Sequence, residues 1–216
     1  MTIYFREKEI VTPGQLLSDE GQKPGEGTYA EGKNIFAAQT GLAVPGKTII
    51  SVIPIRGPYV PKPGDNIVGV VVDTRPGAVE VDVGHQNTAT MKVSPRLRRA
   101  PADVKLGDVV TGKISYRGLK GLFLDEREGI TKIRKGLLIT LTPTKIPRLI
   151  GRKGSMINVI KRETGCQLHV GRNGLIVVSG ASPSKELAAV SAIRLIEERA
   201  HTSGLTDRVT EYLKKA

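Results

Sequence analysis

The sequence predicts a multidomain protein that is mostly β, with an α+β domain at its carboxyl end. Its 216 residues suit two or three small domains better than a single one. Short β-prone runs separated by glycine and proline fill the first 135 residues. From residue 136 the pattern changes to a strand, two helices, two strands and a long helix. We therefore predict three domains, over residues 1–60, 61–135 and 136–216.

Residues 1–60 predict a small all-β domain that is rich in glycine and proline. The clearest strand is Thr48–Ile55, because most of its residues are β-branched. Shorter strands are expected around tight turns, and residues 41–47 are expected to be one of these turns because they hold two glycines and a proline.

Residues 61–135 predict a second β domain, which follows a proline-stiffened joint. Its β-prone segments lie at residues 66–73, 77–84, 88–93, 107–114 and 119–124. Residues 129–135 are expected to close a barrel. Five strands in about 70 residues resemble an OB-fold barrel. Among OB folds, this segment is most similar to the S-one RNA-binding domain.

The third domain is expected to begin with a strand at residues 137–141 and a short helix from Pro143 to Ile150. A glycine loop follows, and a second helix is expected from Ser155 to about residue 164. The remaining expected elements are strands at 167–170 and 175–179 around an Asn-Gly turn, a long helix capped by Ser182-Pro183, and a last helix near 206–214.

The glycine loop Gly151-Arg152-Lys153-Gly154 carries the strongest functional signal in the chain. Its glycines have no Cβ, so a phosphate backbone can come close, and its two cations supply positive charge. Ser155 can open a helix whose first amides also favour an anion. With isoleucines on both sides, the loop resembles the signature of the KH domain, which clamps about four nucleotides of single-stranded nucleic acid. The expected order βααββα matches the type I KH topology.

Residues around this loop have two interpretations. Five aliphatic residues can either form the floor of a base-binding groove or belong to the core, namely Ile150, Ile157, Ile160, Leu168 and Val170. Lys161 and Arg162, further along the second helix, can extend the positive face or simply be solvated.

The second domain has a dense basic cluster, Arg96, Arg98 and Arg99, in the loop at residues 95–106. Other loop cations that can join it are Arg75, Arg117 and Lys120. RNA-binding barrels often stack bases on exposed aromatic side chains. This chain has no Trp, and of the remaining candidates, Tyr116 and Phe123, the second is expected to lie in the core. We therefore predict that the barrel holds RNA mainly by charge, with little base preference and a steep dependence on salt.

No catalytic, cofactor or metal site is predicted. His85, His169 and His201 lie in separate segments without a paired carboxylate motif. The acidic residues within 125–128 are expected to form a solvated turn rather than a metal site. The single cysteine, Cys166, is expected to be a small buried residue, and it excludes both a disulfide within the chain and a cysteine-based zinc site.

The formal net charge of +12 indicates a polyanionic partner. The net charge is 0 over residues 1–60, +5 over 61–135 and +7 over 136–216. The neutral first domain is therefore expected to have a different role from the other two. No secretory leader and no run of about 20 apolar residues is seen, so we expect a soluble cytoplasmic protein.

Three stretches together resemble one family. They are Val11–Gly14 with Gly25–Tyr29, Tyr59–Gly69, and Ile150–Ile157 with Gly171–Ile176. Over essentially its whole length the chain resembles the archaeal exosome RNA-binding cap subunits of the ribosomal-RNA-processing-four type.

This resemblance implies a non-catalytic role. Three such subunits, alone or mixed with a zinc-ribbon sister subunit, would cap a hexameric ring of ribonuclease-PH-like proteins. The barrels would line the entry pore, and the KH domains would lie outside it. Single-stranded RNA would be captured and guided to phosphorolytic 3′-to-5′ sites in the ring, and the neutral first domain would dock on the ring.

Two alternatives remain at this point. A transcription elongation or antitermination factor also places an S-one barrel before KH domains, but it would need a second KH module. A fragment of polynucleotide phosphorylase would place the KH domain before the barrel and would need catalytic domains that are absent here.

Overall fold

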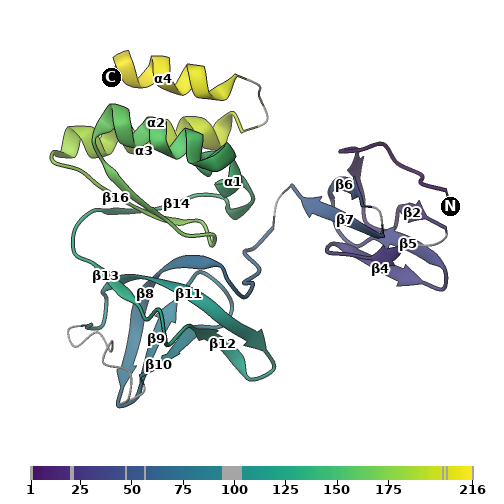
Figure 1. Ribbon diagram of the computed structural model, residues 1–216, viewed down its shortest axis with the longest axis horizontal. Coiled ribbons are helices and arrows are strands. Elements are labelled where there is room, and N and C mark those ends of the chain that lie inside the picture. Colours follow the sequence, from purple (N-terminus) through teal and green to yellow (C-terminus); the bar gives the residue numbers. More distant parts are fainter. Residues whose placement is uncertain are drawn as a thin grey trace. The chain divides into compact units, whose positions relative to one another are not determined.

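The computed structural model describes residues 2–19, 22–46, 48–55, 57–93, 104–200, 202 and 204–215. The chain divides into two compact units, Met1–Gly57 and Pro58–Ala216 (Figure 1). The second unit contains both the barrel and the helical part of the chain. The finer division into three domains stays a prediction.

The first unit consists of two small sheets. One has the order β1 (Ile10–Val11), β6 (Gly41–Pro45), β7 (Ile49–Pro54) and β3 (Lys23–Pro24). The other has the order β2 (Leu16–Ser18), β5 (Asn34–Ala37) and β4 (Thr28–Glu31). Their shared core holds Phe5, Val11, Leu17, Ile35, Ala37, Ala43, Ile50 and Val52.

The expected turn at residues 41–47 is wrong, because most of this segment is the strand β6. Ala43 is fully buried and pairs with Val52. A Cβ on Gly41 would collide with the carbonyl oxygen of Ile53 on the neighbouring strand. This glycine therefore allows close strand packing rather than a turn.

The barrel of the second unit is built from β8 (Asn66–Arg75), β9 (Ala78–Asp82), β10 (Ala89–Lys92), β11 (Val109–Gly118) and β12 (Gly121–Leu124). Strand β12 pairs in parallel with β10 and antiparallel with β11, which also pairs with β8. These pairings close five strands in the order 8-9-10-12-11, so the predicted five-stranded OB-fold barrel is confirmed.

The prediction that residues 129–135 close the barrel is wrong. Strand β13 (Thr131–Ile133) instead adds to β11 on the side away from β8. Strand β11 is ten residues long and irregular between Ile114 and Tyr116. Its first half pairs with β8 and β13, and its second half pairs with β12, which completes the barrel.

The KH part confirms the predicted order βααββα. Its elements are β14 (Leu137–Thr140), α1 (Ile146–Ile150), α2 (Ser155–Thr164), β15 (Gln167–Val170), β16 (Leu175–Ser179) and α3 (Pro183–Glu198). The sheet is antiparallel in the order β14-β16-β15, and helices cover one of its faces (Figure 1). A further helix, α4 (Leu205–Lys215), packs on α2 and α3. The core between helices and sheet includes Leu149, Ile160, Ile176 and Ile193.

The turn between β15 and β16 holds the KH part against the barrel. Asn173 is buried there and bonds to the backbone of Val68 and Val83. The backbone N–H of Arg172 also donates to the carbonyl of Asn66 at 2.8 Å. The turn expected at Asn173-Gly174 is therefore present, and it also makes a contact that local sequence does not predict.

Candidate nucleic-acid interface

The glycine loop joins α1 to α2 through one turn of 3-10 helix, Arg152–Gly154. Gly151 has φ 73° and Gly154 has φ 81°, values that favour glycine. A Cβ on Gly151 would lie 2.7 Å from the backbone nitrogen of Met156. Any larger residue at position 151 would therefore have to displace the start of α2.

Lys153 shares this unusual backbone geometry although it is not a glycine. Its φ is 51° and its ψ is 31°, which places it in the left-handed region. This conformation costs roughly 1–2 kcal/mol for a residue with a side chain. Such residues persist where the surrounding structure fixes them, and they gather at binding sites. The loop thus presents a preformed backbone.

The cations of the loop point into solvent. Arg152 and Lys153 are both exposed, and the side chain of neither makes an ion pair or hydrogen bond with a residue that the structure describes. Ser155 begins α2, and no side chain caps this helix. The N–H of Ser155 donates to the carbonyl of Arg152, and the positive end of the α2 dipole still favours an anion beside it. Beside the loop lies a hollow of about 470 Å³, lined partly by Arg148, Arg152 and Ser155.

The structure divides the five aliphatic residues near the loop. Ile160 and Leu168 are buried in the core. Ile150, Ile157 and Val170 are only partly buried and pack against that core. These three can offer apolar surface to a base, whereas the first two are structural.

The two cations further along α2 also differ. Lys161 is exposed and has no ionic partner among the described residues. Arg162 is held by its neighbour Glu163, with 2.7 Å between Nη2 and Oε1. Lys161 therefore remains the better candidate for extending the positive face.

Arg75, expected to bind RNA from the barrel, is already paired. Its Nε lies 2.5 Å from Asp73, its Nη2 lies 3.6 Å from Glu80, and the hydrogen bond to Asp73 raises its pKa. Two carboxylates therefore offset its charge and weaken it as a phosphate ligand. The cluster Arg96, Arg98 and Arg99 lies outside the described residues.

Arg117 and Lys120 lie on the hairpin between β11 and β12, and both are exposed. They line different hollows: Arg117 lines one together with Asn87, and Lys120 lines another together with Phe123. The structure therefore brings Lys120, and not Arg117, to the hollow that Tyr116 and Phe123 line.

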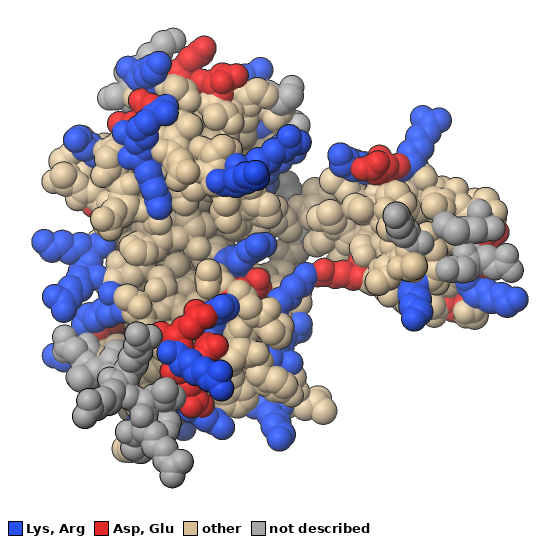
Figure 2. Space-filling model, in the orientation of Figure 1, with Lys and Arg blue, Asp and Glu red and all other residues tan. Residues whose placement is uncertain are grey.

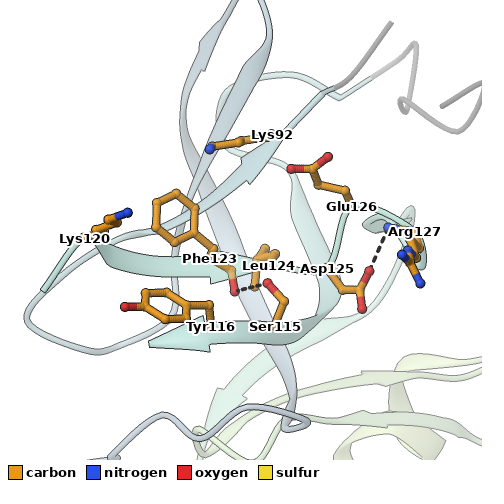
Figure 3. Close-up of a pocket in the computed structure, with 9 residues that line it drawn as sticks. All are labelled: Lys92, Ser115, Tyr116, Lys120, Phe123, Leu124, Asp125, Glu126 and Arg127. Carbon is orange, nitrogen blue, oxygen red and sulfur yellow. Dashed lines mark hydrogen bonds between the residues drawn. The ribbon is translucent and has the colours of Figure 1, made fainter. Parts of the chain in front are cut away.

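The expectation that Phe123 lies in the core is wrong. Its neighbours Leu122 and Leu124 are buried, and Phe123 alternates to the outer side of β12. There it pairs with Tyr116, which is 45% exposed, with 6.2 Å between the ring centroids. Figure 3 shows both rings at a hollow of about 650 Å³, which we call the aromatic hollow.

Sequence reasoning missed cations at both of these sites. Lys92 follows the inward-facing Met91 on β10, and its ammonium nitrogen lies 5.2 Å from the centre of the Phe123 ring. Arg148, on α1, lines the hollow beside the glycine loop. Strand alternation could have placed Lys92 on the outer face, because apolar and polar residues alternate through β10.

The polar residues that suggest other chemistry have structural partners. Asp125 accepts hydrogen bonds from the backbone of Arg127 and Glu128, at 2.7 and 3.4 Å, so it closes a turn. Glu128 pairs with Lys113. Cys166 is buried, as expected. Within the described part of the chain, no group of three or more His, Cys, Asp or Glu side chains could hold a metal ion.

Positive charge is spread over the second unit. Figure 2 shows Lys and Arg side chains standing out at many points on its visible face rather than gathered in one patch. Among the described residues, no helix is long and apolar enough to span a bilayer.

Comparison with known proteins gives matches along most of the chain. Residues 137–195 match the KH domain family. Residues 10–44 match the family described as the exosome complex exonuclease RRP4 N-terminal region. The KH match agrees with the order βααββα seen at those residues.

Individual relatives cover nearly the whole chain. Exosome complex component Rrp4 of Thermococcus kodakarensis is 38% identical, over 98% of this chain and 87% of the relative. The protein of the same name from Methanothermus fervidus is 37% identical, over 98% of this chain and 97% of the relative. A crystal structure described as an exosome complex RNA-binding protein is 30% identical, with a TM-score of 0.64, over 74% of this chain and 97% of that one.

Proposed function

Because the chain belongs to the family of exosome components named Rrp4, we propose that it captures single-stranded RNA and guides it to a phosphorolytic exoribonuclease ring. In this proposal it is a cap subunit without catalytic activity of its own. One observation carries the proposal: the glycine loop has a preformed backbone and two cations that face solvent. Whole-chain similarity to exosome components favours it over the transcription elongation alternative.

The KH part would hold the sugar-phosphate backbone. Gly151 and Gly154 allow a phosphate to approach the loop, and Arg152 and Lys153 supply positive charge between the two glycines. The positive end of the α2 dipole, which begins at Ser155, adds to the attraction for a phosphate oxygen. None of these groups reads a base, so we expect the loop to contribute affinity more than sequence preference.

The barrel would contribute further cations along the path of the RNA. Lys120 and Arg117 stand on one hairpin, and Lys92 stands on the neighbouring strand β10. The same proposal includes Arg96, Arg98 and Arg99, which precede β11 in sequence. Because the charges are dispersed, binding should track the backbone of a flexible strand.

The first unit would dock on the ring of ribonuclease-PH-like subunits. Ile10 faces Leu42 on β6, which faces Ile53 on β7, so an apolar row crosses three strands. Ile10 is 61% exposed and Ile53 is 53% exposed. Exposed apolar rows of this kind mark protein contacts. Three copies per ring, alone or mixed with a zinc-ribbon sister subunit, are part of the same proposal.

Reconstitution tests this function. The purified chain should bind labelled single-stranded RNA without degrading it. Added to a ring of ribonuclease-PH-like subunits, it should co-elute with the ring and accelerate phosphate-dependent degradation. Degradation by the chain alone, or a ring whose rate is unchanged by a bound chain, would contradict the proposal.

A further inference from the structure

A β-bulge places Tyr116 beside Phe123 on the outside of the barrel. Ile114 pairs with Leu124, but Tyr116 rather than Ser115 pairs with Phe123. Strict alternation would turn Tyr116 to the same inner side as Ile114, which is buried. The extra residue, Ser115, moves Tyr116 to the outer side. The hydroxyl of Ser115 donates to the carbonyl of Phe123 at 3.1 Å.

This aromatic pair has no structural task in the barrel interior. Neither ring belongs to the core cluster of the barrel among the described residues. The rings are tilted by 44° and open onto the aromatic hollow. Its volume of about 650 Å³ lies within the range of small-ligand sites, roughly 300–1,000 Å³. Two aromatic faces in a surface hollow are the usual platform for an unpaired base.

The two ends of the hollow differ in charge, because one holds only lysines and the other holds two carboxylates with Arg127. Lys92 and Lys120 lie on the same side as the rings, and Asp125, Glu126 and Arg127 lie toward the other end (Figure 3). A phosphate would be attracted to the lysines and repelled by the carboxylates. This arrangement sets a direction in which the backbone runs on the lysine side and the base points inward.

We propose that the aromatic hollow stacks an unpaired base of single-stranded RNA on Phe123 and Tyr116, while Lys92 and Lys120 bind the adjoining phosphates. The inference rests on the proposed RNA-binding function and deepens it, because it adds base contact where sequence reasoning predicted charge alone.

Lys92 covers the Phe123 ring. Its ammonium nitrogen lies 5.2 Å from the ring centre, which is a cation–π contact. At an exposed site this contact is weaker than the stacking of a base on an aromatic ring. An arriving base therefore displaces the lysine, whose flexible stem lets it turn to the phosphate.

Two RNA-like probes of equal length separate stacking from charge. One is single-stranded RNA of about 12 nucleotides, and the other carries the same phosphates on abasic residues. We expect Phe123→Leu to weaken binding of the RNA about tenfold and to leave the abasic probe unaffected, because leucine keeps the apolar bulk but removes the π-face. Phe123→Tyr should bind the RNA as the wild-type chain does. The weaker binding of Phe123→Leu should persist at high salt.

A matched control is Tyr212→Leu, since Tyr212 is 40% exposed and lies on α4. Tyr116→Leu should weaken RNA binding, whereas Tyr212→Leu should not. If the wild-type chain binds RNA better than the abasic probe and the Tyr116 and Phe123 variants bind as it does, the stacking site is wrong and the proposed function stands. If the wild-type chain binds neither probe, the proposed function itself fails.

Discussion

The side-chain amide nitrogen of Asn173 lies 2.6 Å from the carbonyl oxygen of Val68, so the KH part donates a hydrogen bond into the first barrel strand. The same nitrogen donates to Val83 at 2.9 Å, and the amide oxygen of Asn173 accepts from the N–H of Val68 at 3.3 Å. Asn173 is 6% exposed. One buried side chain thus satisfies three backbone groups of the barrel.

Replacement of Asn173 should therefore destabilise the second unit. Asn173→Ala leaves three buried backbone groups without partners and should cost about 2–4 kcal/mol. Asn173→Asp should cost at least as much, because a carboxylate would face two carbonyl oxygens. Thermal unfolding should show both losses. Unchanged stability in both variants would mean that water replaces the amide.

Charge reversal in the glycine loop should weaken RNA binding without unfolding. The double change Arg152→Asp and Lys153→Asp removes two phosphate contacts, and both side chains are exposed. The slope of log K against log salt should fall by about 1.4, or about 0.7 for each lost contact on a single strand. Lys23→Asp with Lys33→Asp, exposed residues of the first unit, is the control of equal charge. Equal affinities of the two double variants at low salt would exclude a role for the loop.

The left-handed backbone of Lys153 gives a separate prediction about stability. Lys153→Gly should raise the free energy of unfolding by about 0.5–1 kcal/mol, because glycine adopts φ 51° without strain. Lys153→Ala keeps the strain and should leave stability nearly unchanged. Both variants should weaken RNA binding equally, since both lose the ammonium. If Lys153→Ala unfolded at a higher temperature than Lys153→Gly, the strain argument would be wrong.

Much of this fold could be predicted from local signals. The Gly-Asp pairs before β8 and β11 are an example: Gly64 and Gly107 have positive φ. Asp65 accepts from the backbone N–H of Lys62 and Asp108 from that of Lys105, so each closes its turn. The loop Gly151–Gly154 has the same character, since its glycines and flanking isoleucines fix its geometry locally.

Three features could not be predicted because they depend on distant partners. Asn173 and Val68 are 105 residues apart, and nothing near Asn173 distinguishes its contact from an ordinary hairpin turn. Tyr116 faces outward only because the bulge at Ser115 shifts the register of β11 against β12. Gly41 resembles a turn glycine until its close approach to another strand is seen.

A pH-dependent contribution to stability is expected from Glu197 on α3. Burial raises its pKa, but hydrogen bonds from the backbone and hydroxyl of Thr142 and from Arg194 outweigh this, and the pKa is lowered below 4.5. The folded state therefore gains stability that is complete above pH 4.5 and is lost as the pH falls through the lowered pKa.

The variant Glu197→Gln tests whether the contribution of Glu197 to stability is lost at low pH. Near pH 7 it should be about 1 kcal/mol less stable than the wild-type chain, because it loses charge-assisted hydrogen bonds. As the pH falls below the lowered pKa, the two unfolding temperatures should converge. A difference that stayed constant from pH 7 to pH 3 would show that the charge of Glu197 does not stabilise the fold.

The apolar row of the first unit gives the last prediction. Ile10→Asp with Ile53→Asp places two charges on the exposed face of β1 and β7, away from the core. A buried unpaired carboxylate is costly in a protein interface, so the variant should fail to co-elute with the ring. Its affinity for RNA should be unchanged, because the proposed RNA contacts lie in the second unit. Tyr29→Asp, on an exposed residue of β4 in the other sheet, controls for surface charge. If the double variant still co-eluted with the ring, the docking surface would have to lie outside the row of Ile10 and Ile53.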